Sequence, residues 1–275
     1  MNIFELIFFR LEVLFYFTIF LFLAFSTVVV QFFTFLILFP VLFYDRKFIH
    51  KVGNRFIYSS IHFFMFTFNR KWKYVVLSDF PKYDPKRPKI FMFNHLSNAD
   101  PIFLTVLGKR VFSGALYKDS LHILYPRFFT SLVGHTPIYF TYDKVRKTKT
   151  VKKECIAEVM RRCKELTTDG FSILVFPEGT RSKTGALQEF KDGFFRFAME
   201  NNYEIVPCTL HNTRNVLTQN NYMTKGTVYL KYGEPILPQG KDLEDLKFEV
   251  RKTMYEMIKS SPDFDPKVET VPELE

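Results

Sequence analysis

The sequence lacks the signatures of several common enzyme classes. It contains no G-x-S-x-G stretch, which argues against an α/β-hydrolase, and no G-x-x-x-x-G-K-[ST] stretch, which argues against a P-loop enzyme. It has no zinc-finger or RNP-type pattern that would favour nucleic acid as a partner. Four histidines do not cluster in the sequence, so a metal site has no support: His50, His62, His122 and His135.

Cysteine is scarce, with three residues at positions 155, 163 and 208. No pair of them has metal-ligand spacing. Cys155 and Cys163 lie eight residues apart on an expected helix, which separates them by about 12 Å, too far for a disulfide. We therefore expect free thiols in a reducing compartment.

Charge is absent from residues 13–44, a run rich in phenylalanine. A helix needs about 20 apolar residues to cross the hydrocarbon core of a bilayer, so this run is long enough to span. A tilted span or a bent re-entrant pair also fits, with the bend near Ser26, Thr27 or Gln31. A signal peptide is disfavoured because no A-x-A-like site follows the run, and a buried soluble helix because the run has no polar face.

The charge that is present is mostly positive, with a formal net charge of +10 and a sequence pI of about 9.3. This balance suits an anionic partner, and the apolar N-terminus favours a membrane surface over nucleic acid. Basic residues follow the apolar run and place the rest of the chain on the cytoplasmic side of a membrane: Arg46, Lys47, Lys51 and Arg55. A second aromatic stretch, residues 56–68, is short for a span and predicts an interfacial helix.

Beyond residue 70, strand-like and helix-like patterns alternate without an internal repeat. This alternation predicts an α/β fold, a mixed sheet flanked by helices, after an N-terminal hydrophobic membrane-binding helical segment. We expect membrane-anchoring helices in 1–70, the main domain in 71–260 and a loose, Pro- and acid-rich tail in 261–275. The expected strands are 74–77, 89–93, 112–117, 137–141, 171–176, 204–210 and 227–232. The expected helices are 101–108, 121–132, 144–166, 194–200 and one that starts near 242.

The stretch Asn94-His95-Leu96-Ser97-Asn98-Ala99-Asp100 stands between an expected strand and an expected helix. Strand ends in α/β sheets are where functional sites gather. If a tight turn folds between them, Asp100 can hold one imidazole nitrogen of His95 and leave the other to accept a proton. Alternatively, Asp100 is the N-cap of a helix whose first residue is Pro101.

A second stretch, Phe176-Pro177-Glu178-Gly179-Thr180-Arg181-Ser182, also follows an expected strand. Gly179 permits a sharp backbone turn, and the planar fork of Arg181 suits a phosphate group. Taken alone, the stretch is better explained as a turn with a solvated arginine.

Together these stretches resemble the glycerolipid acyltransferase superfamily, specifically the 1-acylglycerol-3-phosphate acyltransferases. The first family motif, N-H-x-x-x-x-D, is matched by Asn94, His95 and Asp100, and the third, F-P-E-G-T-R-S, by residues 176–182. Both occur in the right order, which makes the resemblance specific. The second motif is matched by Lys118, Pro126 and Gly134, the continuation of the third by Phe190, Lys191 and Gly193, and the fourth by Val206 and Pro207. At Asp143-Lys144 the family more often has Asp-Arg, which weakens the case for a bidentate contact there.

The resemblance implies that His95 and Asp100 are catalytic. His95 would remove a proton from a glycerol hydroxyl, which then attacks the thioester of acyl-CoA or acyl carrier protein. The resemblance also implies a substrate-binding set, in which Arg181 holds the acceptor phosphate with help from Lys118: Asn94, Lys118, Glu178, Gly179, Thr180 and Arg181. No metal or cofactor is implied beyond the acyl donor, and no covalent intermediate on Ser97 or Cys208.

The implied reaction converts lysophosphatidic acid to phosphatidic acid at a membrane, with membrane lipids as partners. Two alternatives remain open at this stage. One is the same chemistry on another lysophospholipid or a lyso-aminolipid. The other is a non-catalytic membrane protein that keeps the fold as a lipid-binding module.

Overall fold

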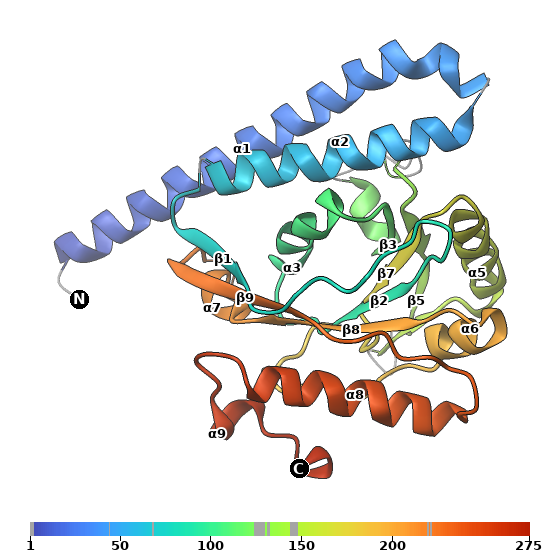
Figure 1. The fold of residues 1–275 in the computed structure, drawn as a ribbon. Helices are drawn as coiled ribbons and strands as arrows, with labels where there is room; N and C mark the ends of the chain where they lie inside the picture. The colour runs from blue at the N-terminus through green and yellow to red at the C-terminus, as the bar shows by residue number, and fades with distance from the viewer. Residues whose placement is uncertain are drawn as a thin grey trace.

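The computed structural model describes residues 3–43, 45–67, 69–123, 130, 133–143, 148–218, 220 and 222–275. Two long helices open the chain, α1 (Ile3–Leu38) and α2 (Arg46–Thr67), and they lie side by side on one side of the molecule (Figure 1). The turn between them is a short 3₁₀ helix, Phe39–Phe43, that contains Pro40. Proline cannot continue an α-helix. The chain therefore bends there, and α1 is continuous through Ser26, Thr27 and Gln31, where the re-entrant alternative had placed a bend.

A seven-stranded sheet forms the centre of the molecule, in the order β1-β9-β8-β2-β7-β3-β4. Its strands are β1 (Trp72–Val76), β2 (Ile90–Phe93), β3 (Ser113–Lys118), β4 (Thr136–Ile138), β7 (Ser172–Val175), β8 (Ile205–His211) and β9 (Gly226–Tyr232). The five strands from β8 to β4 are mutually parallel, whereas β9 is antiparallel to β8 and parallel to β1. The prediction of a mixed sheet flanked by helices is confirmed.

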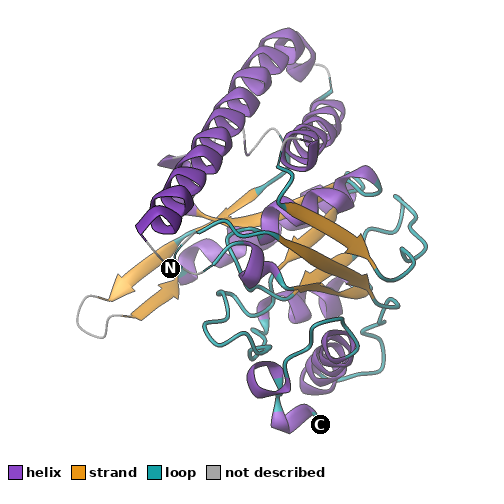
Figure 2. Ribbon diagram, turned by 90° about the vertical axis from the view of Figure 1, so that its left-hand side faces the viewer, coloured by secondary structure: helices purple, strands orange, loops and turns teal. Residues whose placement is uncertain are grey.

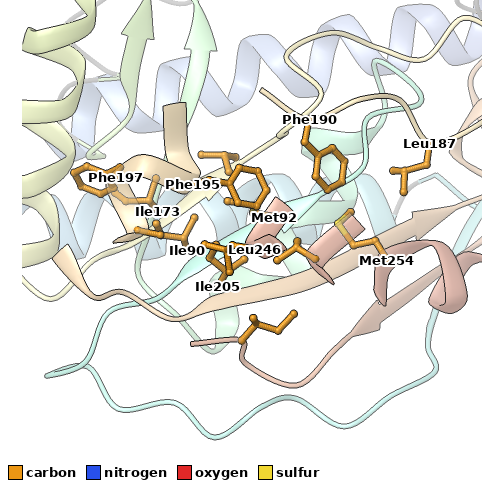
Figure 3. Close-up of a cluster of buried hydrophobic side chains, with 14 of the residues drawn as sticks. Ile90, Met92, Ile173, Leu187, Phe190, Phe195, Phe197, Ile205, Leu246 and Met254 are labelled. Carbon is orange, nitrogen blue, oxygen red and sulfur yellow. The ribbon is translucent and has the colours of Figure 1, made fainter. Parts of the chain in front are cut away.

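Helices cover both faces of this sheet (Figures 1 and 2). They are α3 (Asp100–Phe103), the 3₁₀ helices Leu104–Lys109 and Asp119–Ile123, α5 (Lys153–Thr168), α6 (Gly193–Asn201), α7 (Thr213–Val216) and α8 (Leu243–Lys259). Ile90 and Met92 of β2 pack with α5, α6 and α8, and Figure 3 shows both side chains in this cluster of buried residues. Phe91 and Phe93 pack with α2 and α3. Side chains alternate between the two faces of a strand, so a strand buried on both faces is apolar throughout.

Helix α2 is bonded into the α/β domain. The side-chain amide of Asn54 donates to the backbone carbonyls of Ser113 (2.9 Å) and Val133 (2.8 Å), and Arg55 donates to the carbonyl of Gly108. One face of α2 is therefore internal. Buried hydrogen-bonding groups hold this face to the sheet side, and the interfacial role expected for residues 56–68 stays a prediction.

The expected helix over 144–166 was too long at its start. Residues 144–147 lie outside the described part of the chain, and Thr148–Val151 (β6) pairs antiparallel with Phe140–Asp143 (β5). Figure 2 shows this pair extending from the body of the molecule. Thr148, Thr150 and Val151 are β-branched, which favours a strand. The expected helix over 121–132 falls largely outside the described part of the chain.

The tail after residue 260 is docked, not loose. It forms α9 (Pro266–Glu269) and a 3₁₀ turn (Pro272–Leu274), and Val271 and Leu274 are buried against the core. The prediction from composition failed because two apolar residues among the prolines and acids reach the core.

Among the described residues, no helix combines the length and apolarity that a membrane crossing requires. The prediction of a membrane-spanning helix therefore finds no support in this part of the chain.

Candidate active site

The two motif loops meet because their strands are neighbours. Strand β2 pairs parallel with β7, so the loops that follow Phe93 and Val175 leave the sheet at the same edge. Strand β3, which ends at Lys118, pairs parallel with the other side of β7. The carboxyl ends of parallel strands are the usual place for a site in an open α/β sheet.

His95 and Asp100 are in direct contact. The Nδ1 atom of His95 lies 2.6 Å from Oδ2 of Asp100, and the same oxygen accepts the backbone N–H groups of Leu96 (2.7 Å) and Ser97 (2.9 Å). The Asp100 side chain is fully buried, whereas that of His95 is 20% exposed. Asp100 begins α3 but does not cap it, since the N-cap position is Ala99 and makes no side-chain bond. The structure thus favours the pairing over the capping interpretation and leaves Nε2 of His95 unused by Asp100.

Two further sets of contacts fix His95: one to the face of its imidazole ring and one to its backbone. It stacks on Phe176 with ring centroids 4.0 Å apart and planes 15° from parallel. The His95 backbone N–H donates to Oε1 of Glu178 (2.6 Å), and its carbonyl accepts the N–H of Ser182 (2.8 Å). The two motifs therefore hold each other.

Glu178 is an internal anchor rather than a surface carboxylate. It is 1% exposed, and its Oε2 accepts both the backbone N–H (3.1 Å) and the side-chain amide (2.9 Å) of Gln188. Burial raises the pKa of Glu178, although the hydrogen bonds from His95 and Gln188 oppose that shift. The position suits a group that shapes the loop and does not touch a ligand directly.

Asn94 was predicted to bind substrate, and its geometry indicates a different task. Its amide nitrogen donates to the carbonyl of Leu210 (2.9 Å), its oxygen accepts the N–H of Leu210 (2.8 Å), and the residue is 1% exposed. Both polar atoms of the side chain thus join the end of β2 to β8. Asn94 fixes the strand from which His95 emerges.

The remaining candidates lie exposed around this buried centre. Gly179 has φ +71°, a backbone conformation that favours glycine, and Thr180 and Arg181 follow it on the surface. Lys118 is exposed at the end of β3. Because β7 lies between β2 and β3, Lys118 is about 10 Å from the end of β2, at two strand spacings. The structure brings these groups to one edge of the sheet and does not bond them to His95.

Comparison with known proteins identifies the family of this chain. Residues 73–211, half of the chain, match the Acyltransferase family. This chain belongs to the Acyltransferase family. A chloroplastic 1-acyl-sn-glycerol-3-phosphate acyltransferase of Arabidopsis thaliana is 30% identical over 63% of this chain and 44% of its own length. One of Cocos nucifera is 32% identical over 54% of this chain and 45% of its own length.

The chain spans about half the length of the curated relatives that it matches. The crystal structure of the 1-acyl-sn-glycerophosphate acyltransferase PlsC from Thermotoga maritima aligns with a TM-score of 0.63 at 21% identity. That alignment covers 93% of this chain and 100% of the other. It supports the fold of this acyltransferase-family chain.

Some predictions for this acyltransferase-family chain lie outside the described residues, and one contact was not foreseen. Pro126 and Lys144, from the second-motif region, are not described. Gln188 has no place in the motifs named above, yet it binds Glu178 through two hydrogen bonds. No pattern in the sequence marks it.

A cavity of about 610 Å³ lies between α2, α5 and Gly134, and none of the candidate site residues is among the residues that line it.

Proposed function

We propose that this chain transfers an acyl group from acyl-CoA or acyl carrier protein to the free hydroxyl of 1-acylglycerol-3-phosphate, giving phosphatidic acid. One observation carries the proposal: the buried Asp100 holds Nδ1 of a part-exposed His95 inside the region that matches the Acyltransferase family. The relatives named as 1-acyl-sn-glycerol-3-phosphate acyltransferases support the choice of acceptor.

In this reaction Nε2 of His95 is the general base. With Nδ1 protonated and directed at Asp100, Nε2 takes the proton of the acceptor hydroxyl while the hydroxyl oxygen attacks the thioester carbonyl. The new C–O ester bond forms, the C–S bond breaks, and the proton passes from His95 to the leaving thiolate. The buried Asp100 carboxylate stabilises the imidazolium that exists between these two proton transfers.

Direct attack is favoured over an acyl-enzyme. The hydroxyl of Ser97 donates to the carbonyl of Leu217 (2.9 Å) and accepts the N–H of Ala99 (3.2 Å), so it is engaged away from His95. Cys208 is fully buried, and that burial raises its pKa well above the ordinary thiol value, which opposes a reactive thiolate. Neither residue offers an activated nucleophile.

We assign the acceptor phosphate to the exposed cations at the same edge of the sheet. Arg181 follows the turn at Gly179 and presents a guanidinium fork that matches a phosphate. Lys118 contributes a second positive charge from the end of β3. Glu178 and Gly179 set the course of the loop that carries Arg181.

We also propose that α1 binds a membrane, with the α/β domain on the cytoplasmic side. Apolar side chains recur along its exposed surface at helical spacing: Leu14, Phe15, Phe22, Phe25 and Ile37. Phe22 and Phe25 are each 67% exposed, and an apolar surface of this kind needs a cover other than water. A fusion of residues 1–70 to a soluble reporter tests this. We expect the reporter to stay with membranes after carbonate extraction, and its recovery in the soluble fraction would defeat the proposal.

The experiment that tests the function uses the purified full chain with a panel of lysolipids and with acyl-CoA or acyl carrier protein, and identifies the products by mass spectrometry. We expect phosphatidic acid as the main product, formed about 10²–10⁴-fold more slowly by the matched variant His95→Ala. A preference for another lysophospholipid would change the acceptor, and no transfer to any acceptor would indicate a lipid-binding module.

Varying both substrates should give intersecting double-reciprocal lines, because direct transfer needs both bound together. Parallel lines would indicate an acyl-enzyme.

A further inference from the structure

A buried arginine forms hydrogen bonds with the segment that follows the third motif. Arg251 lies in the middle of α8 and is only 8% exposed. Its Nε donates to the carbonyl of Gln188 (3.1 Å), and its Nη2 donates to the carbonyl of Leu187 (3.3 Å). A guanidinium this deeply buried needs partners for its donors, and these are two consecutive carbonyls together with two carboxylates.

The two carboxylates come from different segments of the chain. Glu189 lies 2.6 Å from Nη1, and Glu273, in the C-terminal segment, lies 3.0 Å from Nη2. The C-terminal segment is held in place independently of Arg251, because Leu274 is 2% exposed and Glu275 accepts hydrogen bonds from α8. Arg251 therefore joins the docked end of the chain to the segment after the third motif.

The contacts continue from Gln188 to the catalytic histidine. The carbonyl of Gln188 is held by Arg251, while its backbone N–H and its side-chain amide both donate to Oε2 of Glu178. The other carboxylate oxygen of Glu178 accepts the backbone N–H of His95. Three successive contacts thus lead from Arg251 to His95, and each joins buried or half-buried groups.

We infer that Arg251, seated by Glu273, is a positioning residue for His95 that acts through Gln188 and Glu178. This inference rests on the proposed function. A lysine at this position has one ammonium and cannot donate in a fixed fork to two carbonyls and two carboxylates. When the fork is lost, Gln188 is free to shift, and the hold of Glu178 on His95 loosens. A misplacement on the order of 1 Å can cost about a hundredfold in rate.

A double-mutant cycle in the full chain tests this route. We expect Arg251→Met to lower kcat by about tenfold, with the KM of both substrates unchanged, because the geometry of the base is disturbed and no ligand contact is lost. Arg251→Lys should recover thermal stability but not kcat. In a Glu178→Gln background, Arg251→Met should lower kcat by less than about twofold, since the route is already broken. Losses that multiply independently in the double variant would overturn the inference.

The C-terminal segment supplies a matched pair of controls. Glu273→Gln removes a carboxylate that touches Arg251, and Glu275→Gln removes one that touches Tyr255 and Lys259 instead. We expect a kcat loss of roughly twofold to threefold for the first, as for an exposed charge pair, and unchanged kcat for the second. Equal effects of the two substitutions would indicate a general role in stability and overturn the assignment.

One readout does not depend on transfer activity. If the wild-type chain acylates no acceptor, the proposed function fails, and the NMR spectrum of ¹³C-labelled histidines at one fixed pH still reports on the surroundings of His95. His95 is identified there by the signal lost in His95→Ala. We expect Arg251→Met to shift the ring signal of His95 when Glu178 is present and not in the Glu178→Gln background. An unshifted signal in Arg251→Met would overturn the inference.

Discussion

The candidate site has a buried half and an exposed half, and they are built in opposite ways. In the buried half, the oxygens of Asp100 and Glu178 accept hydrogen bonds from backbone and side-chain donors, and the ring of His95 stacks on Phe176. In the exposed half, Arg181 and Lys118 lie at the surface. Oδ2 of Asp100 and both carboxylate oxygens of Glu178 have partners within the protein, whereas Oδ1 of Asp100 is buried and has no hydrogen-bond partner among the described residues. The cations of the second half face solvent.

This difference follows from what each half is proposed to do. A general base must sit in one orientation before the substrate arrives, so its supports are internal and rigid. A cation that binds a phosphate must keep its N–H donors available. The donors of a solvated arginine bond to water until the phosphate replaces it. Substitutions in the buried half should therefore change kcat and stability, and those in the exposed half should change the KM of the acceptor.

The largest effect should come from removing the base. His95→Ala should lower kcat by about 10²–10⁴-fold, since that is the usual contribution of a general base, while the protein still folds. Steady-state kinetics and thermal unfolding of the same preparation measure both. Ser97→Ala is a matched control from the same loop and should keep at least half of the wild-type kcat. Retention of more than about a tenth of kcat in His95→Ala would refute the assignment.

Glu178→Gln should show the next largest loss of kcat, together with a change in stability that depends on pH. Burial raises the pKa of Glu178 above its ordinary value of 4.5, so the folded state binds the proton more tightly than the unfolded state. Its contribution to stability is therefore fully present below pH 4.5 and is lost as pH rises through the raised pKa. The stability of the wild type relative to Glu178→Gln should fall as pH rises from 4.5, as measured by thermal unfolding. A difference that is flat with pH would contradict this.

Much of the centre of the fold could be predicted from the sequence, because local patterns decided it. The apolar stretches that became β2, β7 and β8 are buried on both faces, so they carry a continuous hydrophobic signal. The five-residue spacing beside a strand end allowed the pairing of His95 with Asp100 but left helix capping by Asp100 open, and the family resemblance favoured the pairing. The start of α5 was missed because the basic residues before it gave no clear period.

Long-range contacts could not be predicted in the same way. Nothing local shows that Asn94 is bonded to Leu210 on β8, or that Gln188 holds Glu178. The docking of Val271 and Leu274 depends on a surface assembled from distant helices and strands. A composition rich in proline and acid describes the tail and not its partner surface.

Arg181→Lys tests the exposed half of the comparison. A lysine keeps the charge but cannot form two parallel hydrogen bonds with a phosphate. We expect the acceptor KM to rise by roughly tenfold, the value of one lost charge-assisted bond, with the donor KM and kcat little changed. Initial rates at varied acceptor concentration measure this. If only the donor KM rises, Arg181 belongs to the other substrate.

Lys118→Met should have the smallest effect. Lys118 is exposed and lies two strands from β2, and an exposed charge pair is worth about 0.2–1 kcal/mol. We therefore expect a rise in acceptor KM of roughly 1.4-fold to 5-fold, with unchanged kcat, and the effect should fade as salt shortens the range of the interaction. Lys109→Met is the matched control, because Lys109 is exposed before the start of β3 whereas Lys118 stands at its end. It removes the same charge at the opposite edge of the sheet and should leave the acceptor KM unchanged. If both substitutions raise the acceptor KM equally, the effect is one of net charge, and Lys118 does not contact the phosphate.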